Sequence, residues 1–80
     1  MKIGTVTGCV WATRKAESLQ GQTFLVVRTG EEELVAADQV GAGPGDRVLL
    51  AIGTVASRFC MEAPVDAAVV AIVDTKRDNP

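Results

Sequence analysis

The chain has 80 residues, of which 48% are hydrophobic and 4% aromatic, and its formal net charge is −2 with no histidine. That length allows one domain with one core, and the apolar content excludes a disordered chain. The acidic balance disfavours a nucleic-acid or anionic-membrane surface, no apolar run reaches the length of a membrane span, and no apolar signal region is seen, so a mature cytoplasmic protein is expected.

The first half of the chain predicts a long strand followed by a hairpin. Residues 2–12 are rich in β-branched side chains, and Gly4 and Gly8 permit this strand to bend or bulge. Residues 13–21 are polar and predict a loop. A strand over residues 22–28, a short acidic turn over residues 29–32 and a strand over residues 33–37 together predict a hairpin.

The second half begins with a loop that is dense in glycine. Residues 41–46 hold three glycines and a proline, which predicts consecutive turns. A strand over residues 47–52, a helical turn or short helix over residues 54–61 and a strand over residues 67–74 follow. Five short strands with glycine-rich turns predict a mainly all-β fold, a small five-stranded OB-like β-barrel that occupies residues 1–75 as a single domain, with a polar tail over residues 76–80.

Several of the predicted strands are apolar on both faces. Residues 24–27, 48–52 and 67–73 show this lack of alternation. A barrel this small has one interior, and only alternate residues can point into it. The outward half therefore predicts packing against further copies of the chain in a closed ring, because soluble monomers rarely expose large apolar patches. Alternatively, the short helix and the 13–21 loop cover these faces.

No group of residues forms a recognisable catalytic or metal site. Cys9 and Cys60 are too few for a disulfide framework, and without histidine they cannot make an ordinary zinc site. The glycine-rich loop lacks both GxGxxG spacing and a following Walker lysine, so a turn is predicted rather than a phosphate cradle. Asp38, Asp46 and other carboxylates flank strands, where turn hydrogen bonds explain them more simply than acid–base catalysis. Neither an enzyme nor a bound cofactor is expected.

Three segments in fixed order resemble the bacterial microcompartment vertex proteins of the EutN/CcmL family. The resemblance covers nearly the whole chain, and three motifs in order are specific where one alone would be moderate. The matching residues are Val6, Gly8, Val10, Thr13, Lys15, Leu19, Gly21, Leu25 and Val27, then Val35-Ala36, Asp38, Val40-Gly41-Ala42-Gly43, Gly45-Asp46 and Val48-Leu49, then Pro64, Asp66-Ala67, Val69-Val70 and Ile72-Val73-Asp74.

This resemblance implies a structural shell protein. Members form cyclic pentamers that cap the five-fold vertices of a polyhedral shell in the cytoplasm, which is otherwise tiled by hexameric shell proteins. The resemblance also implies a place near the ring axis or the subunit interface for the loop that consists of Gly41, Ala42, Gly43, Pro44 and Gly45. Small residues would allow backbones to approach closely there. The basic residues Arg14 and Lys15 are expected either to be solvated or to face a neighbouring subunit.

Two departures from the family pattern leave details open. Relatives often carry a longer insertion after the second strand, and here Arg58 is displaced by one position in a Gly-Ser-Ser-Ala-Arg-like segment. The roles of Arg58, Cys9 and Cys60 and the type of compartment are therefore not assigned, although the run from Trp11 to Lys15 most resembles glycyl-radical-associated members. The alternative functions are an OB-type binding module for single-stranded nucleic acid or a small ligand, which would need a basic groove with aromatics, and a small enzyme subunit.

Overall fold

The computed structural model describes residues 1–74, which form five strands and two short 3-10 helices. The strands and helices, in chain order, are β1 (Lys2–Val10), η1 (Glu17–Leu19), β2 (Thr23–Thr29), β3 (Glu32–Asp38), β4 (Arg47–Ile52), η2 (Thr54–Phe59) and β5 (Ala67–Ile72). No helix among the described residues is long and apolar enough to cross a membrane.

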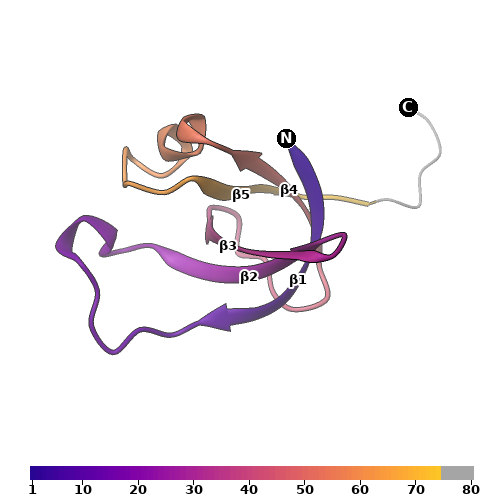
Figure 1. Ribbon diagram of the computed structural model, residues 1–80, viewed down its shortest axis with the longest axis horizontal. Coiled ribbons are helices and arrows are strands. Elements are labelled where there is room, and N and C mark those ends of the chain that lie inside the picture. Colours follow the sequence, from indigo (N-terminus) through magenta and orange to yellow (C-terminus); the bar gives the residue numbers. More distant parts are fainter. Residues whose placement is uncertain (75–80) are drawn as a thin grey trace.

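The five strands close into a barrel in the order β1-β2-β3-β5-β4 (Figure 1). All neighbouring strands are antiparallel except β3 and β5, which run parallel and share only the pairs Ala37 with Ala68 and Asp38 with Val69. Closure gives every strand a partner on both sides, although β3 meets β5 only at its last two residues. The expected five-stranded OB-like barrel is confirmed.

The long first strand serves two partners because it bends. Its beginning pairs with β4 and its second half pairs with β2, and the register with β2 shifts between Val6 and Gly8. Gly4 lies where β1 crosses closest to β2: a Cβ atom there would lie 2.6 Å from Val27 Cγ1 and 2.8 Å from the carbonyl oxygen of Arg28. Only glycine fits such an approach without displacing the neighbouring strand.

The barrel interior is filled by alternate residues of all five strands. This main cluster of buried residues comprises Val6, Leu25, Val27, Ala36, Val48, Leu50, Ala67 and Val69. Each of them is at most 4% exposed. Burial of these aliphatic side chains supplies the main driving force for folding, at roughly 25 cal/mol per Å² of apolar surface removed from water.

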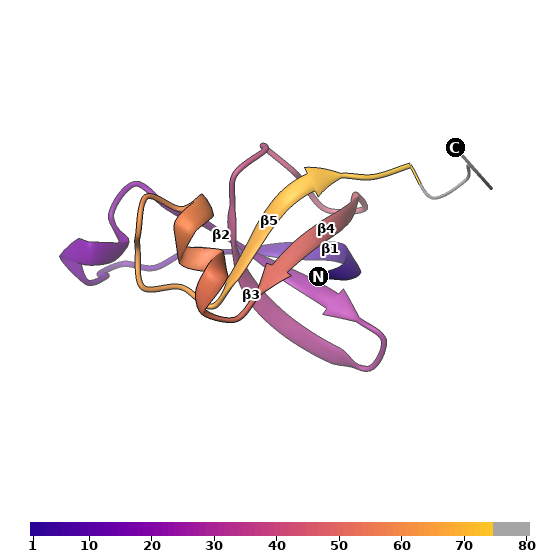
Figure 2. The same cartoon turned by 90° about the horizontal axis from the view of Figure 1, so that it is seen from above.

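A second apolar cluster lies outside the barrel, beneath η2. Ala56 and Cys60 at the helix and its end pack on the outer faces of Ala37, Ala51 and Ala68. Figure 2 shows η2 lying beside the start of β5. The alternative in which the short helix covers an outer face is therefore correct for this part of the barrel, and the small alanine side chains let the helix approach closely.

The segment between β1 and β2 covers little of the outer face, where Lys15 lies over the ring of Phe24. It contains η1, a turn that the sequence did not predict, and projects from one end of the barrel in both views (Figures 1 and 2). The helix expected over residues 54–61 is a 3-10 helix that ends at Phe59, and the last strand ends at Ile72 rather than at residue 74. The tail expected over residues 76–80 lies outside the described residues.

Candidate functional site

The glycine-rich loop between β3 and β4 is held by two carboxylates at its ends. Asp38 Oδ1 accepts hydrogen bonds from the backbone N–H groups of Val40, Gly41 and Ala42 at 3.1, 3.2 and 3.3 Å. Asp46 Oδ2 accepts one from the N–H of Gly43 at 2.9 Å. These contacts confirm that both aspartates serve the turn, and they leave neither carboxylate poised for acid–base chemistry.

The same loop is also tied to β1. The Gly45 N–H donates to the Val6 carbonyl oxygen at 2.8 Å, and the Val6 N–H donates to the Asp46 carbonyl oxygen at 2.9 Å. Gly41 and Gly45 have φ values of 77° and 94°, in the left-handed region that favours glycine. The loop is thus an ordered surface feature with a defined shape, and its backbone N–H groups are largely occupied within the loop rather than free for an anion.

The two basic residues singled out in the sequence lie at the other candidate position, on the projecting β1–β2 segment. Lys15 Nζ donates to the Gln22 carbonyl oxygen at 3.1 Å and lies 5.7 Å from the centre of the Phe24 ring. Within residues 1–74, Arg14 is exposed and makes no hydrogen bond or ion pair. Lys15 therefore makes its contacts within the chain, whereas the charge of Arg14 is exposed to solvent or to a partner.

Two glutamines that the sequence analysis did not single out link distant parts of the fold. Gln22 Nε2 donates to the Cys60 carbonyl oxygen at 3.2 Å, and Gln39 Nε2 donates to Gln22 Oε1 at 3.2 Å. The first contact joins residues 38 positions apart. No local pattern signals such a long-range pair, so these residues could not be found before the barrel was known.

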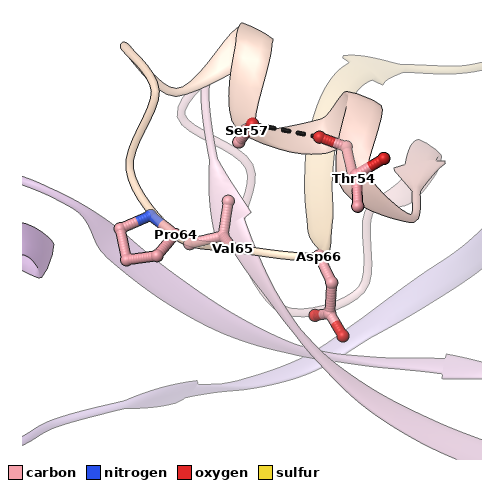
Figure 3. Close-up of a pocket in the computed structure, with 5 residues that line it drawn as sticks. All are labelled: Thr54, Ser57, Pro64, Val65 and Asp66. Atoms are coloured by element: carbon pink, nitrogen blue, oxygen red, sulfur yellow. Dashed lines mark hydrogen bonds between the residues drawn. The ribbon is translucent and has the colours of Figure 1, made fainter.

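A shallow depression of about 490 Å³ lies between η2 and the segment that leads into β5 (Figure 3). Thr54, Ser57, Pro64, Val65 and Asp66 line it. The Ser57 hydroxyl donates to the Thr54 carbonyl oxygen at 3.0 Å, and the Asp66 carboxylate points away from that hydroxyl. A nucleophile and a base are therefore not brought together here.

The remaining chemistry of the described residues is modest. A smaller groove of about 180 Å³ lies under Trp11, which is 91% exposed, and Cys9, Lys15 and Phe24 also line it. Both cysteines are free; Cys9 is exposed, whereas burial raises the pKa of the Cys60 thiol. In residues 1–74 no three acidic, cysteine or histidine side chains gather as a metal site would require.

The outer surface of the described chain carries many large hydrophobic side chains. Large hydrophobic side chains remain substantially exposed at Ile3, Val10, Trp11, Val35, Val40, Val55, Phe59, Met61 and Ile72. Since η2 covers only the alanine-lined part of the barrel, the predicted surplus of apolar outer surface is still present in the single chain. A surface of this kind is typical of a subunit that buries it against other proteins.

Known proteins resemble this chain over almost its full length. The family described as "Ethanolamine utilisation protein EutN/carboxysome" matches residues 1–74. The carboxysome shell vertex protein CcmL of Synechococcus elongatus is 49% identical in an alignment of 84 positions, gaps included. The alignment covers 94% of this chain and 85% of that protein.

Two solved structures share the barrel. The pentameric microcompartment shell protein GrpN of Rhodospirillum rubrum superposes with a TM-score of 0.83 at 40% identity, covering 94% of this chain and 96% of that one. The pentameric shell protein of the RMM microcompartment gives a TM-score of 0.88 at 37% identity, covering 100% and 98% of the two chains.

Proposed function

This chain belongs to the EutN/CcmL family of microcompartment shell proteins, and from that premise we propose that it is a structural shell vertex protein that works as a ring of five copies. Proteins of its own length and fold that are described as pentameric shell proteins support the five-fold ring. The subunit then acts in the cytoplasm, in the shell of a bacterial microcompartment, and by assembly rather than by catalysis.

The observation that carries this function is the uncovered apolar surface of a closed barrel. The outer face of a closed barrel offers mainly side chains, rather than backbone groups, to a partner. Burying such side chains against identical neighbours is the usual way in which a small subunit gains stability through a closed ring.

We propose that hexameric shell proteins surround this ring. A flat layer of six-fold tiles cannot close by itself, and five-fold units supply the corners at which the layer turns. A pentamer of this subunit therefore fits the vertex, with the hexamers as its lateral neighbours in the shell.

Within the ring, we place the loop of residues 41–45 near the five-fold axis or the subunit interface, and we place Arg14 at the interface. The loop's small residues allow close approach of backbones, and its hydrogen bonds to Asp38 and Asp46 fix its shape before assembly. Arg14 has an unengaged guanidinium among the described residues, whereas Lys15 contributes indirectly by holding its own segment in place. Residues 1–75 act as one domain in this arrangement.

The decisive experiment is the mass of the purified chain by native mass spectrometry, with light scattering at several concentrations as a check. A discrete five-subunit species is expected, and it should persist as the protein is diluted. A stable monomer under these mild conditions would rule out the vertex function for this chain.

A further inference from the structure

Two rows of outward side chains on the barrel are left uncovered by the described chain. The first, the β4 row, runs across β1, β4 and β5 and consists of Ile3, Leu49 and Ala71, which are paired in register. Leu49 alternates with the fully buried Val48 and Leu50, so this row faces away from the barrel interior. Ile3 is 47% exposed.

The second row lies on the part of the sheet where β1 pairs with β2. This β2 row runs across β1, β2 and β3 and consists of Gly8, Val26 and Val35, which are also paired in register. Val26 alternates with the buried Leu25 and Val27, so the row points outward, and Val35 is 53% exposed. The neighbouring pair Val10 and Phe24 extends its apolar surface.

A third outer row shows what the fold does when it covers such a surface itself. Ala37, Ala68 and Ala51 are also paired in register, and η2 buries all three to 1% exposure or less. Both the β4 row and the β2 row contain larger side chains, namely Ile3 and Leu49 in the first and Val26 and Val35 in the second, and neither helix covers them. The chain therefore provides its own cover for one of its three apolar outer rows and leaves two open.

Gly8 supplies independent information on the β2 row. Its φ lies outside the left-handed region, and a Cβ atom at this position would meet nothing within 4 Å. Gly8 follows the register shift of β1, but neither its φ nor its surroundings in the described subunit exclude an alanine at this position. A residue without a side chain at the β1 end of this row allows another surface to approach the strand closely.

A ring needs two unlike faces on every copy, one for each neighbour, because its interfaces are head-to-tail. We propose that the β4 row of one copy packs on the β2 row of the next, with the side chains of Ile3 and Leu49 meeting Val26 and Val35 and the space that Gly8 leaves beside Val26. This inference rests on the proposed ring, and it specifies which two faces of the same chain are complementary.

The test uses one charged substitution in each row and a matched control. Ile3→Asp disables the β4 row, Val35→Asp disables the β2 row, and Val55→Asp places the same charge on η2 at a side chain that is 50% exposed but belongs to neither row. Native mass spectrometry of each variant is expected to show loss of the five-subunit species for the first two and its retention for Val55→Asp. Circular dichroism checks that each variant is folded.

Mixing the two disabled variants tests the pairing itself. A copy with Val35→Asp keeps its β4 row and a copy with Ile3→Asp keeps its β2 row, so together they can form one intact junction. With one variant labelled with ¹⁵N, a mixed dimer is expected that neither variant forms alone. Homodimers of a single variant, or the absence of a mixed dimer, would overturn the pairing.

The milder substitutions Val35→Thr and Gly8→Ala keep the test valid if the aspartate variants do not fold. Threonine preserves the branched shape, and the alanine methyl group meets open space within the subunit. Both variants are expected to shift half-dissociation to a concentration on the order of tenfold higher, because the packed surface loses apolar contact or close fit. A wild-type monomer would refute the ring, whereas a wild-type pentamer with unaffected variants would refute only these two faces.

Discussion

At the residue scale, Gly4 provides the clearest steric constraint in the barrel. In Gly4→Ala, the new methyl group would collide with Val27 and with the backbone carbonyl of Arg28, so β1 and β2 must move apart. We expect a loss of about 1–3 kcal/mol in the free energy of unfolding, as for other overpacked cores. Chemical denaturation followed by circular dichroism measures it.

Gly43→Ala is the matched control for that substitution. Gly43 has a φ outside the left-handed region, and its added methyl group would meet nothing within 4 Å. Its free energy of unfolding should stay within about 0.5 kcal/mol of the unsubstituted chain. Equal losses for the two glycines would show that the close approach of β1 to β2 is not what requires Gly4.

The buried thiol of Cys60 predicts a fall in stability at alkaline pH. Burial raises the pKa of Cys60 in the folded chain, whereas the unfolded thiol ionises near its ordinary pKa of 9.0. Below that pH both states are neutral and the thiol adds no pH dependence. Above it the unfolded state loses its proton first, so the free energy of unfolding falls as pH rises.

Denaturation at pH 7 to 10 in a Cys9→Ser background, with and without Cys60→Ala, isolates this effect. The alkaline fall should be smaller in the alanine variant, and a thiol reagent should reach Cys60 only on unfolding. Rapid modification of Cys60 in the folded chain would contradict its burial.

Some individual residues were readable from the sequence and others were not. Asp38 and Asp46 flank a glycine-rich stretch, and that local pattern correctly predicts hydrogen bonds to the turn. The contacts of Lys15 and Gln22 depend instead on the barrel bringing distant segments together. The expectation that Arg14 and residues 41–45 lie at a subunit interface stays a prediction.

At the element scale, the loop between β3 and β4 depends on one carboxylate. Asp38→Ala removes the acceptor of three backbone N–H groups, and we expect it to lower the free energy of unfolding by about 0.5–1.5 kcal/mol, because water can replace the acceptor at the exposed Val40 and Gly41. Asp38→Asn retains an acceptor oxygen and should lose less. Hydrogen exchange at Val40 to Ala42 reports the loop directly, and unchanged protection in the alanine variant would contradict this role.

The strands were predicted well because their signals are local. β-branched runs separated by glycine-rich turns place every strand to within two residues, and the predicted limits of β4 agree with the structure. The strict alternation expected along the last strand is wrong. Register with β4 shifts between Leu49 and Leu50, so Val70 is an extra residue on β5, and an all-apolar run carries no mark of such a bulge.

At the scale of the whole molecule, that bulge changes which substitutions should separate folding from assembly. Val69 faces the interior opposite Leu50, whereas Ala71 faces outward opposite Leu49, although both positions are odd-numbered. We expect Val69→Asp to unfold the chain because it buries an unpaired charge. Ala71→Asp should stay folded and form smaller species.

Circular dichroism and light scattering on the same samples measure both outcomes. Ala68 also lies on the outer face of β5, but η2 covers it, and it is therefore unsuitable as a control. Val55→Asp again serves as the control, because Val55 is exposed. Unfolding of Ala71→Asp would show that the outer face of β5 is needed within the subunit itself.

The assembly function was predictable from the sequence only in outline. Doubly apolar strands indicated more buried surface than one barrel can use, and the ordered motifs indicated the family. Which outer faces stay open depends on strand register and on where η2 settles, and these follow from the closed fold rather than from any single segment.

The short parallel contact between β3 and β5 has a mechanical consequence. Only two residue pairs close the barrel there, and one of them contains Asp38, whose carboxylate also holds the glycine-rich loop. The adjacent Gln39 N–H adds a hydrogen bond to the Val69 carbonyl oxygen at 3.1 Å. The pairing of β3 with β5 and the conformation of the loop therefore depend on the same residue. A neighbouring subunit that binds the loop would also stabilise this pairing, so local opening of the barrel should be rarer in the ring than in a free subunit.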